Sequence, residues 1–188
     1  MFILRLTIAL VLFYAMACGD DEAQRPAYRA DVPENVSRDT QPVSTLDDAQ
    51  LERVCRSYDA YVQTWVSFES IAYIACLPPA IVLGGSPQGC EQRLDECMAL
   101  FPEPIELDVQ AQVGQVCVDR LGQCDASIAE LEGCVNVNLD LALDIVDNWS
   151  CRGVDDDRRA EAARAMDTVA VCAEVDDPCA EAVAIGPD

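Results

Sequence analysis

Apolar residues recur at three- and four-residue steps along most of the chain after residue 45. This is the period of an amphipathic helix, in which one face packs and the other meets water. The clearest case is a long first helix, which Thr45 followed by Asp48 is predicted to cap. It is predicted to end at Leu77-Pro78-Pro79, because proline disrupts a helix interior. Its apolar face consists of Leu51, Val54, Cys55, Tyr58, Tyr61, Val62, Trp65, Phe68, Ala72 and Cys76.

Two further helices are predicted between residues 89 and 123. The first, from about Gly89 to Phe101, carries two cysteines on its apolar face and is ended by prolines. The second runs from about Leu107 to Gln123. Its start, LDVQAQV, alternates apolar and polar side chains, which is also the period of a strand. Both alternatives stay open for this segment.

A fourth helix is predicted to begin after Ser127, because Glu130 three residues later completes a capping box. Apolar residues then recur at helical steps as far as Trp149. Residues 135–145 also alternate as a strand would, but their asparagines and aspartates disfavour β structure. The cap and the length therefore favour a helix, which Arg152-Gly153 is predicted to stop.

A fifth helix is predicted from about Asp155 to Ala173. Its three leading aspartates suit the positive end of the helix dipole, so they indicate a helix start rather than a cation site. Asp176-Asp177-Pro178 is predicted to break it, leaving a tail. The predicted fold is all-α, a disulfide-stapled bundle of four to five helices. The bundle domain is expected at residues 46–154, with the additional helix and tail at 155–188.

The segment before the helices is predicted to be a tether. Residues 19–45 contain three prolines, many charged and amide side chains, and almost no periodic apolar residues. A flexible coil of 27 residues would hold a domain roughly 30 Å from its attachment point. We therefore expect an acidic flexible tether over residues 18–45.

The N-terminus has the organisation of an export signal. One positive charge, Arg5, precedes an apolar run from Leu6 to Ala17. This length suits a signal peptide and is short for a membrane span. Ala15-Met16-Ala17 has the small-x-small form that a signal peptidase recognises. Residues 1–17 are therefore predicted to be a signal peptide, and no later stretch has the composition of a span.

Export changes how the eleven cysteines are interpreted, because thiols outside the cytoplasm are oxidised to disulfides. Cleavage after Ala17 would make Cys18 the first residue of the mature chain. Ten cysteines follow it, an even number, so five disulfides can form without it. Cys18 is therefore predicted to stand apart as a lipid attachment point.

The residues Ala15-Met16-Ala17-Cys18 resemble the lipobox of bacterial lipoproteins, in which the cysteine is acylated and becomes the N-terminus. Ala15 departs from the leucine that is usual there, and secretion without lipid remains the alternative. The cysteine rhythm after it is similar to that of uncharacterised cysteine-rich lipoproteins of Gram-negative bacteria. The resemblance implies anchoring in the cell envelope, facing the periplasm or the cell surface, and it implies no activity.

One cysteine spacing recurs three times, at 90–97, 117–124 and 172–179. Seven residues are about two helical turns, so the two sulfurs lie about 10 Å apart on one face and cannot bond within the helix. Each is expected to reach a neighbouring helix, except where Pro178 lets the last pair close locally. The predicted bonds are Cys90–Cys124, Cys97–Cys117, Cys55–Cys151, Cys76–Cys134 and Cys172–Cys179.

The residue inventory argues against most catalytic classes. The chain has no His and no Lys, since all twelve basic residues are Arg, which excludes Ser-His-Asp triads, Schiff-base chemistry and phosphate-loop lysines. The cysteine spacings do not fit a zinc site and no Cys-x-x-Cys redox motif is present. No catalytic residue, metal or cofactor is therefore predicted, and a carboxylate-dependent envelope hydrolase is the enzymatic alternative.

The charge indicates the kind of partner. Without residues 1–17 the net charge is 11 − 34 = −23, which repels nucleic acid and keeps a protein soluble. The expected partners are the membrane, through the N-terminal lipid, and an unknown envelope protein or a cationic partner. The leading hypothesis is a membrane-anchored, non-catalytic interaction or structural module. A secreted binder or inhibitor without lipid is the further alternative.

Overall fold

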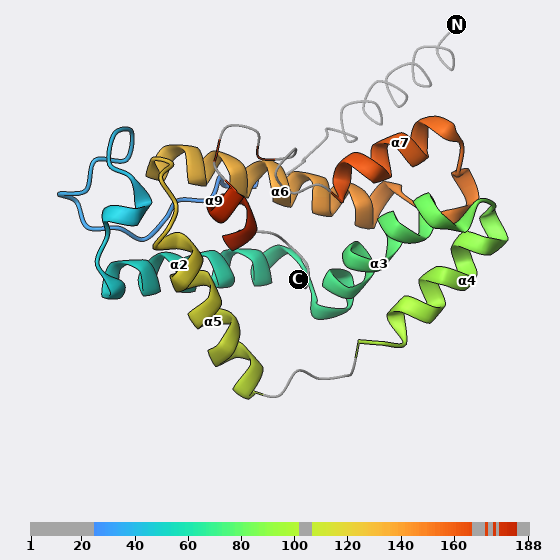
Figure 1. The fold of residues 1–188 in the computed structure, drawn as a ribbon, viewed down its shortest axis with the longest axis horizontal. Coiled ribbons are helices and arrows are strands. Elements are labelled where there is room, and N and C mark those ends of the chain that lie inside the picture. The colour runs from blue at the N-terminus through green and yellow to red at the C-terminus, as the bar shows by residue number, and fades with distance from the viewer. Residues whose placement is uncertain (1–24, 102–106, 167–171, 173–174, 176, 184–188) are drawn as a thin grey trace, which may run out of the picture.

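The computed structural model describes residues 25–101, 107–166, 172, 175 and 177–183, and within them the protein is all-helical, as predicted (Figure 1). The only β feature among these residues is an isolated bridge between Pro42 and Ser127. The described helices are η1 (Val43–Thr45), α2 (Asp48–Trp65), α3 (Phe68–Gly84), α4 (Pro87–Met98), α5 (Leu107–Leu121), α6 (Ile128–Asn148), η2 (Cys151–Gly153), α7 (Asp156–Ala165) and α9 (Asp177–Ala182).

Helix α6 runs along the long axis of the molecule, and the other elements form two groups (Figure 1). The strap half consists of residues 25–46, which we call the strap, together with α2, α5 and α9. The hairpin half consists of α3, α4, η2 and α7. Within each half the elements contact one another closely, α5 with α2 and α9, and α3 with α4 and α7. A single cluster of buried side chains extends through both halves.

The predicted first helix is in fact two helices. α2 ends at Trp65, α3 starts at Phe68, and the two axes differ by 84°. Val66 between them is extended, and Ser67 caps α3 by accepting a hydrogen bond from the backbone of Ser70. A serine at the N-cap competes with continuation of the preceding helix. The apolar pattern did not reveal this break, because both helices bury apolar side chains at helical spacing.

The two prolines predicted to end the first helix lie inside α3 instead. Pro78 and Pro79 remove backbone donors, which ordinarily breaks a helix. Their neighbours Leu77 and Ile81 are completely buried, and α3 packs against α4, α6 and α7. Burial on several sides therefore stabilises a helix that its local sequence disfavours.

The turn from α3 to α4 depends on two glycines. Gly85 adopts a φ of 67° and caps α3 in the left-handed region, which favours glycine. A Cβ on Gly89 would lie 2.1 Å from the carbonyl oxygen of Gly84, so only glycine permits this approach. The close turn folds α4 back along α3 and determines which cysteines meet.

The remaining helices follow the sequence more closely. α6 begins with the predicted capping box, in which Ser127 and Glu130 each bond the other's backbone amide, and residues 135–145 are helical rather than a strand. The predicted third helix is α5, helical from Leu107, so its strand alternative is wrong. The cap of α2 is Asp47 with Gln50, not Thr45 with Asp48.

The tether prediction is wrong from Arg25 onward. Tyr28, Val36 and Val43 belong to the buried core, and Tyr28 is only 2% exposed. The strap is also bonded to the turn before α6, where the Val43 amide donates to the Ala126 carbonyl at 2.9 Å. A few large apolar residues among polar ones are sufficient because residues of α2 and α6 contact them: Tyr28 is bonded to both helices. The part of the predicted tether before Arg25 lies outside the described residues.

The C-terminal region also differs from the predicted helix and tail. α7 ends at Ala165, and α9 starts at Asp177, where a break was expected. Asp155 caps α7 by accepting from the Arg158 amide, which confirms a helix start there. Ala180 and Val183 are buried in the core. This end of the chain is therefore part of the domain.

Candidate functional site

All ten cysteines after Cys18 form disulfides with one another. This confirms the expected number of bonds, but none of the five predicted pairings occurs: Cys90–Cys124, Cys97–Cys117, Cys55–Cys151, Cys76–Cys134 and Cys172–Cys179 are all wrong. The bonds instead join Cys55 to Cys117, Cys76 to Cys97, Cys90 to Cys151, Cys124 to Cys179 and Cys134 to Cys172.

The packing of the helices explains the difference. The prediction paired α4 with α5 because they are consecutive, but α4 folds back on α3. Cys97 therefore meets Cys76 on α3, and Cys90 meets Cys151 in η2. As expected, the paired cysteines of α4 and of α5 and its C-terminal turn each bond to a neighbouring element. Cys172 and Cys179 also bond to other elements, although they were expected to bond to each other.

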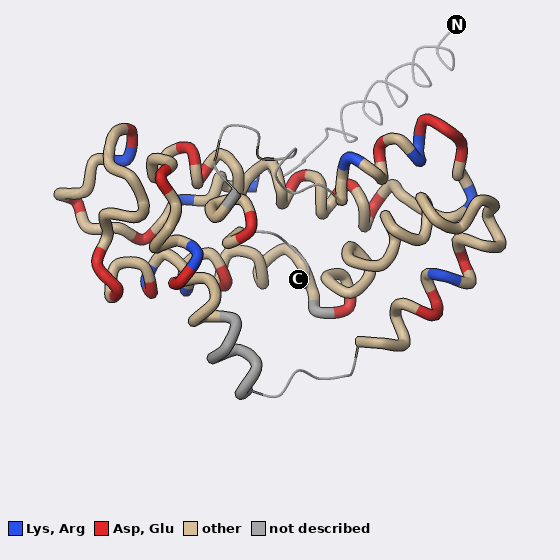
Figure 2. Tube along the Cα trace, viewed as in Figure 1, with Lys and Arg blue, Asp and Glu red and all other residues tan. Residues whose placement is uncertain are grey.

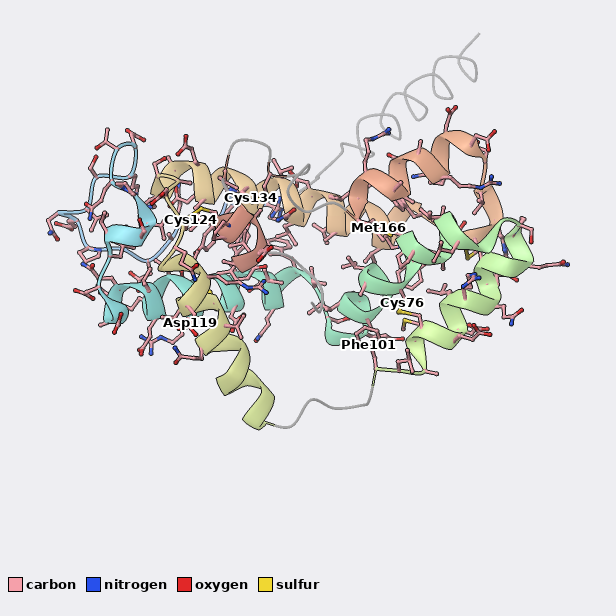
Figure 3. All side chains as sticks on the ribbon, viewed as in Figure 1. Cys76, Phe101, Asp119, Cys124, Cys134 and Met166 are labelled. Atoms are coloured by element: carbon pink, nitrogen blue, oxygen red, sulfur yellow. A yellow bond between two sulfur atoms is a disulfide. The ribbon has the colours of Figure 1, made fainter. Side chains whose placement is uncertain are left out.

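No disulfide joins an element of the strap half to an element of the hairpin half. Figure 3 shows Cys134 on α6, Cys124 at the end of the strap half near it, and Cys76 in the hairpin half. The Cys134–Cys172 bond fixes the C-terminal region to α6, and the Cys124–Cys179 bond fixes it to the turn after α5. Between the halves, α6 and the shared core provide the connection.

Cys18 lies outside the described residues. The five disulfides nevertheless use every other cysteine of the chain, so no partner within the chain is left for an intramolecular bond to Cys18.

Three polar side chains form a stripe along α6, and the strap binds to this stripe. Glu132, Asn136 and Asp140 are four residues apart and therefore share one helix face. The Tyr28 amide donates to the Asn136 side-chain oxygen at 2.8 Å, and Arg25 forms an ion pair with Asp140. The Asn136 amide group in turn donates to the Glu132 carbonyl at 2.7 Å.

Glu132 is the centre of this interface. Its carboxylate is buried, with 3% of the residue exposed, and a buried charge is tolerated only when it is paired and hydrogen-bonded. The Arg29 guanidinium and the Ala30 amide each donate to it at 2.8 Å, and Arg38 forms a second ion pair. Arg38 also donates to the Ala30 carbonyl at 2.9 Å. The strap is thus fixed by a satisfied, charge-assisted network.

The strap begins between α2 and α6. The Arg25 guanidinium donates to the Tyr61 hydroxyl at 2.7 Å and lies 5.7 Å from the centre of its ring. Tyr61 donates in turn to the Pro26 carbonyl at 2.8 Å. Whatever precedes Arg25 therefore leaves the domain beside Tyr61 and Asp140.

Sequence reasoning missed this interface. The sequence does contain a pattern that indicates it. Three acidic or amide residues recur at four-residue spacing on α6, and three arginines lie in the segment interpreted as a tether. Both features also suit a solvated surface, so neither was distinctive by itself.

A shallow depression lies on the hairpin half, lined by Glu69, Ser70, Tyr73, Met98 and Val146. Burial raises the pKa of the Tyr73 hydroxyl, which donates to the Trp149 carbonyl at 3.3 Å. Among the residues that the structure describes in this lining, Glu69 is the one carboxylate. Glycoside hydrolysis generally needs two facing carboxylic groups.

A second carboxylate is altered by burial elsewhere. Desolvation raises the pKa of Asp59, a half-buried residue on α2. Raised carboxyl pKa values occur in general acids, but Asp59 does not line the described depression. Across the residues that the structure describes, no group of three or more His, Cys, Asp or Glu side chains is placed to hold a metal ion.

None of the described helices is by itself long and apolar enough to cross a membrane; α2 and α3 meet that test of length and composition only together, as a bent pair. No family model, curated protein or solved structure matches this chain. The proposals below therefore rest on its own residues.

Proposed function

We propose that this chain is an exported envelope lipoprotein whose helical domain acts as a non-catalytic interaction or structural module. The observation that carries the proposal is the use of the cysteines. Five disulfides join ten of them inside the domain, and the eleventh, Cys18, follows a signal-like apolar run and a small-x-small sequence.

Export is supported by the disulfides themselves. Protein disulfides persist in oxidising compartments and are rare in the reducing cytoplasm. Five of them in a domain of this size are compatible with a protein that works outside the cytoplasm. The lipid is supported by the position of Cys18 and by the absence of any remaining cysteine to which it could bond within the chain.

The non-catalytic role is supported by the residue types that the chain offers. It has no His and no Lys, the residues most used for general base and Schiff-base chemistry. Its buried carboxylate, Glu132, is occupied by the strap arginines. The acidic surface of this disulfide-stapled domain is suited to binding a basic or cationic partner in the envelope.

The lipid is tested by expressing the whole chain in a Gram-negative bacterium with an alkyne-tagged fatty acid. The wild-type protein is expected to incorporate the label and to sediment with membranes, whereas Cys18→Ser is expected to do neither while keeping its disulfides. A wild-type protein that is unlabelled and soluble, with a mass matching an unmodified mature N-terminus, would instead identify a secreted protein without lipid.

A further inference from the structure

We infer that Trp65, at the C-terminal end of α2, lies in the membrane interface when the protein is anchored through Cys18. This inference rests on the proposed lipid anchor and adds an orientation to it: the surface beside the start of the strap faces the bilayer. Three features of the chain support this orientation: the few residues between the anchor and the domain, the place where the strap begins, and the chemistry of the surface next to it.

The anchor is close to the domain. Six residues separate Cys18 from Arg25. Seven residue steps reach at most about 25 Å in any conformation. The sequence had predicted 27 residues of coil, which would leave the domain free to turn in any direction. With the strap fixed to α6, the surface around Arg25 cannot move far from the bilayer.

The strap begins next to the exposed end of α2. Arg25 is held by the Tyr61 hydroxyl at 2.7 Å, and Trp65 follows Tyr61 by four residues, so the two side chains share a helix face about 6 Å apart. Trp65 is 37% exposed, which is unusual for so large an aromatic side chain. The chain has two tryptophans, and the other, Trp149, is buried.

The last turn of α2 carries no charged side chain, although the protein is strongly acidic. Residues 60–68 contain no Asp, Glu, Lys or Arg, and the acidic Asp59 and Glu69 flank them. Figure 2 shows the end of α2 in tan. The nearby Arg25 and Asp140 neutralise each other. Acidic surfaces are repelled by anionic headgroups within a Debye length of about 8 Å, so an uncharged surface is the one that can approach.

Tryptophan has the chemistry that this position requires. Its ring is apolar while its N–H needs a polar partner, and for this reason it is enriched where membrane meets water. A protein partner would also favour an exposed tryptophan, but the short attachment places lipid within reach before any partner arrives.

The two tryptophans allow a direct test. The lipidated full-length protein is reconstituted into phosphatidylcholine vesicles with or without bromine on the acyl chains, which quenches nearby tryptophan. We expect brominated vesicles to lower the emission of the wild-type protein. Trp65→Phe should abolish this lipid-dependent quenching, and this exposed position should tolerate phenylalanine without loss of folding.

Leu83 supplies a matched control. It is 61% exposed and lies near the far end of α3, about 22 Å along the helix from Phe68, where α3 begins. In the Trp65→Phe background, Leu83→Trp should show no lipid-dependent quenching. Equal quenching at both positions would overturn the inferred orientation.

The outcomes separate the two proposals. A wild-type protein that floats with the vesicles but is not quenched, or quenching that persists in Trp65→Phe, would overturn this inference and leave the anchor intact. A protein that carries no lipid and does not float would overturn the anchor and the inference together.

Discussion

Arg38 forms an ion pair with Glu132 across 94 positions of the chain, and this pair joins the strap to the buried side of α6. The carboxylate is 4% exposed, whereas the Arg38 side chain is 35% exposed. Glu132 also pairs with Arg29, whose side chain is 71% exposed. One carboxylate thus has two arginine partners that differ mainly in burial.

Removing Arg38 should therefore cost more than removing Arg29. We expect Arg38→Met to lower the free energy of unfolding by roughly 2 kcal/mol, since it weakens a buried pair but leaves Glu132 two donors. Arg29→Met, an exposed pair, should cost less than about 1 kcal/mol. Guanidinium unfolding followed by circular dichroism measures both. Equal losses would contradict the central role of Arg38.

The disulfides are expected to differ in their resistance to reduction. Cys97 is half-buried, whereas the other nine bonded cysteines are buried, and thiol exchange needs access to a sulfur. Brief treatment with a mild reductant should therefore open Cys76–Cys97 first. Alkylation followed by peptide mapping identifies the opened bond, and early labelling of Cys90 or Cys151 would contradict the expectation. Mapping without reductant tests the five pairings themselves.

Asp59 is expected to weaken the fold at neutral pH. Burial raises its folded-state pKa, so ionisation is harder in the folded than in the unfolded protein, and stability falls as pH rises through that pKa. Asp59→Asn should therefore raise the free energy of unfolding at pH 7 by a few tenths of a kcal/mol, since half-burial leaves the group partly solvated. At pH 3, below the ordinary aspartate pKa of about 3.9, the gain should vanish.

The exposed Asp95 on α4 provides the control for this change. Asp95→Asn should alter stability little at either pH, because its carboxylate is already hydrated. A gain at Asp59 that is the same at pH 3 and pH 7 would argue that desolvation of the charge is not its cause.

Two buried tyrosines should stay protonated until the protein unfolds in alkali. Burial raises the pKa of the Tyr28 hydroxyl to about 12, and burial also raises that of Tyr58. An ordinary tyrosine ionises near about pH 10, so the unfolded chain loses these protons first and stability falls between pH 10 and 12. Absorbance at 295 nm should show both ionising together with loss of helical circular dichroism.

Tyr28→Phe tests the contribution of one of them. The Tyr28 hydroxyl bonds to Ser57 at 2.9 Å and to the Val54 carbonyl at 3.3 Å. Loss of these bonds should cost about 1 kcal/mol at pH 7 and reduce the fall in stability above pH 10. Ionisation of Tyr28 in the folded protein at pH 10 would show that the strap is not packed as described.

The local features of the fold were predictable from the sequence. Ser127 and Glu130 are three residues apart, so the capping box of α6 needs no information from elsewhere in the chain. Helical periodicity likewise identified most helices and the all-α class. The even number of cysteines after Cys18 was sufficient to predict that they pair among themselves.

Tertiary contacts decided the rest, because they join residues far apart in sequence. The partner of Cys55 is 62 residues away and depends on how α2 lies against α5. Pro78 sits inside a helix because neighbouring helices bury its surroundings. The polar strap is part of the domain because Tyr28 and Arg38 bind Asn136 and Glu132 on α6. Local propensity cannot contain that information, since these contacts between α6 and the strap form only after the helices have packed.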